Sequence, residues 1–256
     1  MKLLNKLNNV HLYSTRLLIE RLFDSTFGLF LFQYKKKDNL FNWFYNSLKY
    51  HLVQLSDTKD RFKPYNYYEF GVAEGGSMLL YMLAVKKFCR DYDMDISKFH
   101  IYGFDSFEGL PEAQEGDKRY GWSKGEMSCS SDLIEEKIKR ANFPRENVHF
   151  VKGFYSESLT PELKASFKNN PPALINMDAD YYSSTIQALS WMRDLLPSAA
   201  LFRFDDVWAF HGHPDRGVHK AISEFNNQDK GTLTSFPILG LGGFVYIFAR
   251  KEFEYE

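Results

Sequence analysis

The stretch Glu69-Phe-Gly-Val-Ala-Glu-Gly-Gly-Ser77 decides the fold, because it joins a strand to a helix through a glycine-rich turn. The aromatic run over 65–70 is typical of a buried strand, and the pattern over 77–92 predicts a helix. Glycine permits a tight turn and lets a ligand approach the backbone closely. The glycine spacing is not GxGxxG, which disfavours a dinucleotide-binding turn, and it does not match the P-loop pattern.

Strands and helices continue to alternate along the rest of the chain. This alternation is typical of an α/β fold, so we expect a mostly parallel seven-stranded sheet with helices on both faces and an antiparallel C-terminal hairpin. The further strands are expected at 99–104, 148–151, 173–177 and 199–204, the hairpin at 234–239 and 243–249, and the later helices at 132–141, 162–167, 184–196 and 217–226.

The N-terminal part of the chain has a different character. Residues 3–56 contain no proline, and apolar residues over 17–23 fall near helical spacing. We therefore expect residues 1–60 to form a helical extension that packs on the main domain or on a second copy, giving a homodimer or a higher homo-oligomer. Residues 61–256 are expected to form the α/β domain. An alternative for 27–34, which three lysines follow, is a helix that lies in a membrane interface.

The composition is that of a globular protein. Of 256 residues, 44% are hydrophobic and 25% are charged, which excludes disordered and collagen-like chains. Lys+Arg 32 against Asp+Glu 33 gives a net charge of -1, so no whole-molecule field attracts nucleic acid or anionic lipid. The only two cysteines, Cys89 and Cys129, are too few for a disulfide framework or a structural zinc site. We expect a cytoplasmic protein without a targeting signal, stable membrane insertion or a nucleic-acid partner.

The strand expected at 99–104 leads directly into Asp105. A carboxylate at this position can accept hydrogen bonds from both hydroxyls of a ribose. For Asp105 alone, a helix N-cap or a solvated loop residue is the alternative. Together with the glycine turn, it favours a cofactor that contains a nucleoside.

Four aspartates follow two strands that we expect to be neighbours in the sheet. Asp178 and Asp180 follow the strand at 173–177, and the pair Asp205-Asp206 follows the strand at 199–204. Carboxylates at adjacent strand ends repel one another and raise each other's pKa. A hard divalent cation relieves that repulsion, and oxygen ligands suit Mg²⁺, Mn²⁺ or Ca²⁺. The pair at 205–206 alone could also be an N-cap or exposed acids.

Other polar residues near these strands carry weaker predictions. His211 and His213 stand in a Gly/Pro-containing loop and are expected at the surface, whereas His219 is expected to be structural on the next helix. Arg203 stands inside an otherwise apolar strand, and the sequence does not indicate its partner.

Taken together, these residues resemble the macrocin O-methyltransferase-like family of class I S-adenosylmethionine-dependent methyltransferases. The resemblance covers roughly Tyr65 to Phe225 and implies a Rossmann-like class I methyltransferase fold. It also implies S-adenosylmethionine as the methyl donor and, as the acceptor, a hydroxyl of a glycoside, nucleotide-sugar or polysaccharide unit. It rests on Glu69-Phe-Gly-Val-Ala-Glu-Gly-Gly-Ser77, Gly103-Phe-Asp-Ser-Phe-Glu-Gly-Leu-Pro111, Lys152-Gly-Phe154, Asp178-Ala-Asp-Tyr-Tyr-Ser-Ser-Thr185 and Asp205-Asp206.

The resemblance implies a role for each matching residue. Asp180 would be the general base, while Asp178, Asp205 and Asp206 would hold Mg²⁺ or Mn²⁺. The cofactor would be bound by Glu69, Gly71, Gly75 and Ser77 around its methionine part, by Asp105 and Ser106 at the ribose, and by Gly153 and Phe154 near the adenine.

Three other functions remain as alternatives. The first is a glycosyltransferase, in which the DxD of Asp178-Ala-Asp180 would hold Mn²⁺ against a sugar nucleotide. That class gives no role to the pair Asp205-Asp206. A nicotinamide-dependent reductase would require GxGxxG, and a non-catalytic binding module would carry the acidic side chains at a cost in stability.

Overall fold

The computed structural model describes residues 40–55, 62, 64–117, 122–236 and 245–252. The chain divides into two compact units between Leu40 and Phe41, and the fold below is that of the second unit. The predictions for residues 1–39, including the interfacial helix at 27–34, lie outside the described residues.

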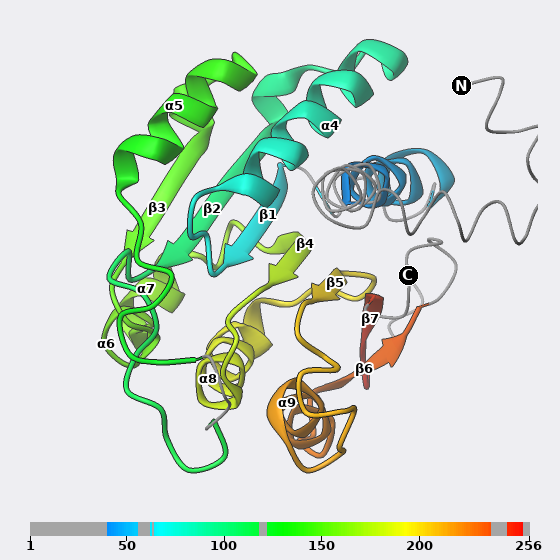
Figure 1. Ribbon diagram of the computed structural model, residues 1–256. Helices are drawn as coiled ribbons and strands as arrows, with labels where there is room; N and C mark the ends of the chain where they lie inside the picture. Colours follow the sequence, from blue (N-terminus) through cyan, green and yellow to red (C-terminus); the bar gives the residue numbers. More distant parts are fainter. Residues whose placement is uncertain (1–39, 56–61, 63, 118–121, 237–244, 253–256) are drawn as a thin grey trace, which may run out of the picture. The chain divides into compact units, whose positions relative to one another are not determined.

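The second unit is built on a seven-stranded sheet with the order β3-β2-β1-β4-β5-β7-β6 (Figure 1). The first five strands in this order are parallel, and β7 is antiparallel to both β5 and β6. From β1 to β3 successive strands are added on one side of β1, whereas β4 and β5 are added on its other side, so the strand order reverses between β1 and β4. The predicted α/β architecture is confirmed. The strands are β1 (Tyr65–Phe70), β2 (Phe99–Asp105), β3 (Val148–Lys152), β4 (Pro172–Met177), β5 (Leu201–Phe204), β6 (Gly231–Ser235) and β7 (Val245–Arg250).

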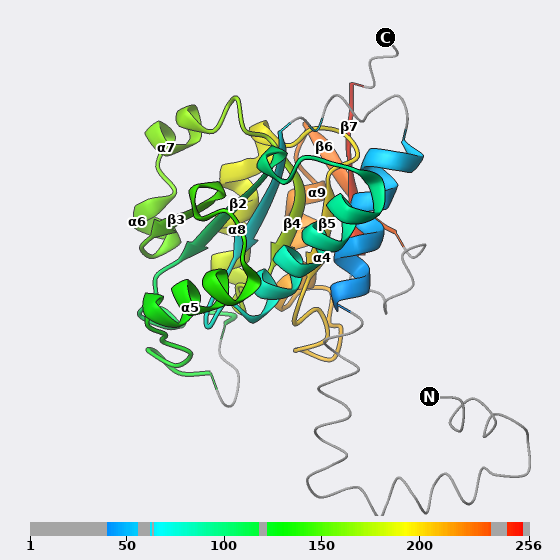
Figure 2. The ribbon, with the colours of Figure 1, turned by 90° about the horizontal axis from the view of Figure 1, so that it is seen from above.

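Helices cover both faces of this sheet (Figures 1 and 2). A helix over residues 40–49, which continues as the π-helical turn η3 (Tyr50–Gln54), lies on the same face as α4 (Gly76–Tyr92) and α5 (Ser131–Ala141). The opposite face carries α6 (Tyr155–Ser158), α7 (Pro161–Ser166), α8 (Tyr182–Met192) and α9 (Gly217–Asn226). Short 3-10 turns are η4 (Ile96–Lys98), η5 (Arg145–Asn147) and η6 (Arg193–Leu195).

The central strands are buried on both faces, as is typical of parallel sheets between two helical layers. All six residues of β1 are buried, and so are all six of β4. On the α8 side, the rings of Phe70 and Phe104 stack with centroids 4.5 Å apart, and Trp191 packs against Phe104. This packing holds the ends of β1, β2 and β4 in place relative to one another.

Some element boundaries differ from the sequence prediction. The strand expected at 199–204 begins only at Leu201, because Ala199 has a φ of 69° and leaves the extended conformation. The helix expected at 184–196 ends as an α-helix at Met192 and tightens into η6. The strand expected at 234–239 is shifted to Gly231–Ser235, and α6 was not predicted, because four residues give no helical period.

Among the described residues, none of the helices is both long enough and apolar enough to span a bilayer.

A buried histidine fastens the first described helix to the sheet. His51 Nε2 lies 2.8 Å from the carbonyl oxygen of Ala199, and Nδ1 lies 2.8 Å from the hydroxyl of Tyr65. Because a carbonyl only accepts, Nε2 carries the proton and Nδ1 accepts from the tyrosine. Burial lowers the pKa of His51 to about 4, so the ring is neutral at pH 7.

We predict that this histidine makes folding stability depend on pH. Its pKa in the folded protein lies below the ordinary value of 6.5, so its contribution is complete above pH 6.5 and is lost as the pH falls toward 4. The free energy of unfolding of the wild type, minus that of His51→Gln, should fall by about 3 kcal/mol over this range. Urea titrations at several pH values measure the difference, and a difference that does not change with pH would contradict the prediction.

Candidate active site at the carboxyl ends of the parallel strands

The parallel ladder continues one residue beyond the strands. At the ends of β3, β1, β4 and β5, the amide of the following residue donates to a carbonyl of the neighbouring strand at 2.9–3.0 Å. The four donors are Gly153, Gly71, Asp178 and Asp205. Backbone hydrogen bonds therefore bring the predicted cofactor residues and two predicted metal ligands to the same edge of the sheet.

Gly71 lies directly against the backbone that follows β4. An ideal Cβ at Gly71 would stand 1.7 Å from the carbonyl oxygen of Asp178, and its φ of 84° is in the left-handed region. Only glycine fits such a position without displacing backbone. Gly75 precedes α4 with a φ of 69°, and Ile134 of α5 packs over it. The glycines thus serve close packing, and their contact with a cofactor stays a prediction.

Asp105 organises the turn after β1. One carboxylate oxygen, Oδ2, accepts hydrogen bonds from the amides of Val72 at 2.7 Å and Ala73 at 2.9 Å. The other, Oδ1, accepts from the amide of Phe107 at 2.6 Å. A carboxylate offers about four acceptor positions, so about one is left for another donor. The sequence did not predict this use of Asp105, and its contact with a ribose stays a prediction.

Glu69 lies at the end of β1, under the same turn. Its carboxylate accepts hydrogen bonds from the hydroxyls of Tyr67, at 2.7 Å, and of Ser77. Burial raises the pKa of Glu69 to about 7, although both hydrogen bonds act to lower it. The structure therefore brings Glu69 and Ser77 together, and their contact with the methionine part of a cofactor stays a prediction.

The other predicted cofactor residues follow β2 and β3. The hydroxyl of Ser106 donates to the carbonyl of Gly109 and is nearly fully buried, so it stabilises its own turn. Gly153 donates to the carbonyl of Asp105, and Phe154 precedes α6. All these positions lie at the edge where the sequence placed them, and their contacts with a cofactor stay predictions.

The acidic residues after β4 and β5 converge. One carboxylate oxygen from each of Asp178, Asp205 and Asp206 lies within 4.8 Å of the other two. Such a set of oxygen donors fits a hard divalent cation, which takes oxygen ligands at about 2.0–2.6 Å. Asp180 does not belong to this group; its carboxyl instead hydrogen-bonds with that of Asp206.

Burial and mutual repulsion raise the pKa of two of these carboxyls, those of Asp178 and Asp180. Burial raises the pKa of Asp180 to about 7, with the charge of Asp206 as the next cause. Burial also raises the pKa of Asp178, and the charge of Asp205 adds to that effect. Asp180 and Asp206 have φ values of 56° and 50°, a conformation that costs a non-glycine residue free energy and is concentrated at functional sites.

The structure identifies the partners of Arg203, which the sequence did not indicate. Its guanidinium donates to Asn176 at 2.8 Å and to Asp205 at 3.1 Å. Asn176 stands opposite Arg203 in the register of β4 and β5 and opposite Glu69 in the register of β1 and β4. A row of polar residues, with Glu69 and Asn176 buried and Arg203 partly buried, therefore connects the glycine turn to the acidic group.

The histidines do not join the acidic group. His211 and His213 are exposed, as expected, and His219 lies on α9 with its ring 5.6 Å from that of Trp208. None of the three belongs to a metal-binding cluster among the residues that the structure describes.

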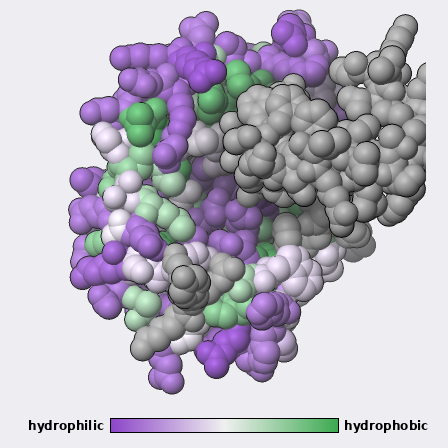
Figure 3. Space-filling model, in the orientation of Figure 1, coloured by the Kyte–Doolittle hydropathy of each residue, from purple (hydrophilic) through white to green (hydrophobic). Residues whose placement is uncertain are grey.

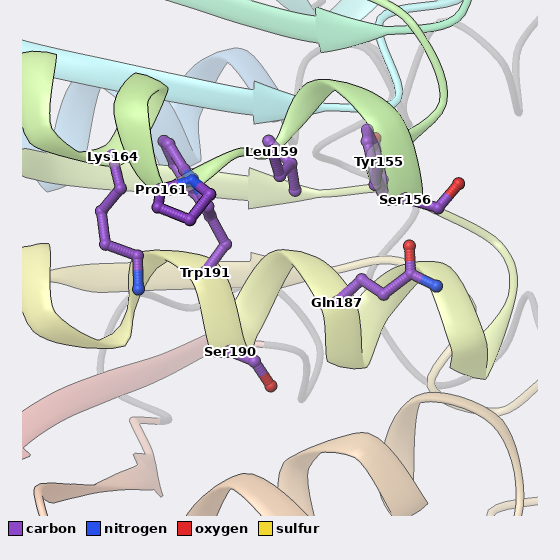
Figure 4. Close-up of a pocket in the computed structure, with 8 residues that line it drawn as sticks. All are labelled: Tyr155, Ser156, Leu159, Pro161, Lys164, Gln187, Ser190 and Trp191. Atoms are coloured by element: carbon purple, nitrogen blue, oxygen red, sulfur yellow. The ribbon is translucent and has the colours of Figure 1, made fainter.

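Hydrophilic residues gather in the middle of the face seen in Figure 3, where β4 ends in Figure 1. A separate cavity of about 420 Å³ opens among α6, α7 and α8 (Figure 4). None of its lining residues is acidic, so it cannot supply the carboxylates of an ion site. It is lined by Tyr155, Ser156, Leu159, Pro161, Lys164, Gln187, Ser190 and Trp191.

Comparison with known proteins gives a family and a set of folds. The family described as "Macrocin-O-methyltransferase (TylF)" matches residues 57–238. The crystal structure of CalS11, a calicheamicin methyltransferase, aligns with 98% of this chain and 91% of its own, at 18% identity and a TM-score of 0.59. The apo structure of CalS11, described there as a TDP-rhamnose 3'-O-methyltransferase, aligns with 98% and 93%, at 17% identity and a TM-score of 0.52.

The O-methyltransferase NovP aligns with 84% of this chain and 79% of its own, at 18% identity and a TM-score of 0.51. At these identities the likeness shows a common fold, the Rossmann-like methyltransferase fold. A search among curated proteins finds no match.

We predict that Gly71→Ala destabilises the protein strongly, whereas Gly76→Ala does not. The new Cβ at residue 71 would overlap the carbonyl of Asp178, but Gly76 has no atom within 4 Å of its Cβ position and opens a helix, where alanine is favoured. Gly71→Ala should lower the free energy of unfolding by about 2 kcal/mol or more, the scale of overpacking plus left-handed strain. Urea denaturation of both variants measures this, and equal stabilities would contradict the close packing.

Proposed function

The chain belongs to the macrocin O-methyltransferase family and is an O-methyltransferase, and we propose that it transfers a methyl group from S-adenosylmethionine to a sugar hydroxyl with the help of a divalent cation. The observation that carries the finer part of this proposal is the convergence of Asp178, Asp205 and Asp206 beside the turn after β1. In open α/β sheets, ligands bind at the carboxyl ends of the strands where the strand order reverses, and β1 and β4 flank that point here.

The residues after β1, β2 and β3 are suited to hold the methyl donor. S-adenosylmethionine, when bound, supplies an electrophilic methyl group on a positively charged sulfur. Asp105 holds the turn after β1, and Glu69 lies under that turn. The side chains of Asp105 and Glu69 are both carboxylic acids, which complement a positively charged ligand. Gly153 extends the same edge by one strand, where the adenine is proposed to lie.

The residues after β4 and β5 are suited to the acceptor. Mg²⁺ or Mn²⁺, when bound, supplies a positive charge that lowers the pKa of a hydroxyl. Asp178, Asp205 and Asp206 would hold it, and their mutual repulsion supports that assignment. Arg203 fixes one oxygen of Asp205, which orients that carboxylate before any ion arrives.

Asp180 is placed to act as the general base. It lies outside the three-residue group but beside it, through its hydrogen bond with Asp206. A general base must stand within reach of the proton that it takes, and Asp180 stands beside the carboxylates proposed to hold the ion. In the ion-free protein, burial raises the pKa of Asp180 to about 7. Asp180 would take the proton of the acceptor hydroxyl while the hydroxyl oxygen attacks the methyl carbon. The methyl–sulfur bond would break, its electron pair would go to sulfur, and S-adenosylhomocysteine would leave as a neutral thioether.

A sugar is the acceptor class that the family supports, and one similar structure is named for methylation of a TDP-rhamnose. The glycosyltransferase alternative gains no support. A DxD site would use Asp178 and Asp180 together, whereas here Asp178 converges with Asp205 and Asp206.

The experiment that tests the proposal compares Asp178→Asn with Asp180→Asn. We expect the wild type to methylate a sugar hydroxyl from S-adenosylmethionine, to stop in EDTA and to recover with Mg²⁺ or Mn²⁺. Asp180→Asn should lose about 10²–10⁴-fold in single-turnover rate, the contribution of a general base, but keep its affinity for Mn²⁺. Asp178→Asn should lose Mn²⁺ affinity as well, as measured by calorimetry.

Three outcomes would contradict parts of this proposal. Full activity in EDTA would remove the cation from the mechanism. Loss of Mn²⁺ binding in Asp180→Asn but not in Asp178→Asn would reverse their roles. Transfer of a sugar from a UDP-sugar, without methyl transfer, would replace the proposed activity altogether.

A further inference from the structure

Three aromatic side chains from different segments meet beside the acidic group; we call Trp122, Tyr181 and Phe210 the aromatic rim. Trp122 comes from the loop between β2 and α5, Tyr181 directly follows Asp180, and Phe210 follows β5. The ring centroid of Trp122 lies 5.7 Å from that of Tyr181 and 6.3 Å from that of Phe210. The hydroxyl of Tyr181 also lies 3.5 Å from the carbonyl of Trp122.

A buried aspartate ties the loop that carries Trp122 to the start of α8. Asp117 is fully buried, and its carboxylate accepts hydrogen bonds from the amide of Ser183 at 3.0 Å and from its hydroxyl at 2.5 Å. The residue that precedes α8, Tyr181, offers no side-chain cap, so Asp117 caps this helix from a loop 66 residues away. The tether therefore holds the loop against the helix that begins after Asp180.

The rings of the aromatic rim differ in how far they are buried, and Phe210 is also held by a close contact. Phe210 packs on Gly217 at the start of α9, where a Cβ would stand 2.6 Å from the Phe210 ring. Tyr181 is fully buried and backs the rim, whereas Trp122 and Phe210 are half-buried and keep part of their surface accessible. A fixed, partly accessible aromatic surface is typical of a ligand-contacting wall.

The rim lies on the acceptor half of the site. The residues proposed for the methyl donor follow β1, β2 and β3, whereas Tyr181 and Phe210 follow β4 and β5. Tyr181 is the residue directly after Asp180, the proposed base. Burial raises the pKa of Tyr181, and the nearby charges of Asp117 and Asp180 raise it further. Although Trp122 belongs to the loop between β2 and α5, its ring lies next to residues that follow β4 and β5, where the acceptor hydroxyl is proposed to lose its proton.

We propose that Trp122, together with Phe210, contacts the apolar C–H face of a pyranose ring in the acceptor and thereby sets acceptor affinity. This inference rests on the proposed function, because it assigns the acceptor site of the same reaction. A pyranose has an apolar face that can lie on an aromatic ring while its hydroxyls point outward from the ring edge. The hydroxyl at that edge would then face Asp180 and the ion-binding carboxylates.

The test compares Trp122→Ala with Trp122→Phe and with Trp208→Ala as the matched control. Trp208 is 58% exposed and follows Asp206 by two residues, and its ring packs against His219 of α9. Trp122→Ala should raise KM for the acceptor about tenfold, the scale of a lost aromatic contact. The dissociation constant for S-adenosylmethionine should not change, Trp122→Phe should recover most of the loss, and Trp208→Ala should resemble the wild type.

The probes are methyl α-D-glucopyranoside, methyl α-D-mannopyranoside and methyl α-L-rhamnopyranoside, used both as methyl acceptors and in binding measured by saturation-transfer NMR. Unchanged pyranoside binding in folded Trp122→Ala would overturn the inference, as would binding to neither protein. A loss of S-adenosylmethionine affinity without a change in pyranoside affinity would assign the rim to the cofactor instead. If pyranosides bind the wild type better than Trp122→Ala but none is methylated, the inference stands and the proposed acceptor chemistry fails.

Discussion

The contact between Gly71 and the backbone of Asp178 is the constraint on which the rest of the site depends. With no side chain at Gly71, the turn after β1 lies on the first residue after β4, and an added Cβ would overlap the carbonyl of Asp178. The same turn is held from its other side by Asp105, which accepts the amides of Val72 and Ala73. Three parallel strands are therefore fixed at their ends by backbone contacts, before any ligand contributes.

This geometry brings together more negative charge than a half-buried edge tolerates without compensation. Two compensations are visible in the protein itself. Arg203 donates to Asp205, and before any ion binds the raised pKa of Asp180 favours a proton shared between Asp180 and Asp206. Both are weaker than a divalent cation at the same place, because one guanidinium and one shared proton neutralise only part of the group. An acidic group held in this partly neutralised form is well suited to exchange a proton for an ion.

Much of the fold could be predicted because each strand end is marked by a change from apolar to acidic or glycine residues, as at Asp105 and Asp178. The contacts within the site could not be predicted in the same way. The tether between Asp117 and Ser183 and the pair of Arg203 with Asn176 join residues far apart in sequence, so no local spacing reveals them. The sequence also does not reveal whether an acidic side chain at a strand end already accepts hydrogen bonds from backbone amides, as that of Asp105 does.

Part of the backbone strain is located where the chemistry is proposed, because four of the nine left-handed non-glycine residues in the described part of the chain lie there. Left-handed non-glycine residues follow β1, β2, β4 and β5, and these are Ala73, Phe107, Asp180 and Asp206. Each costs of order 1–3 kcal/mol, which only a well-packed support can sustain. The stacked rings of Phe70 and Phe104 provide such support at the ends of β1 and β2. Asp180 and Asp206 hold their left-handed conformations with no ligand present, and the proposed base therefore stands next to the proposed ion site before a ligand binds.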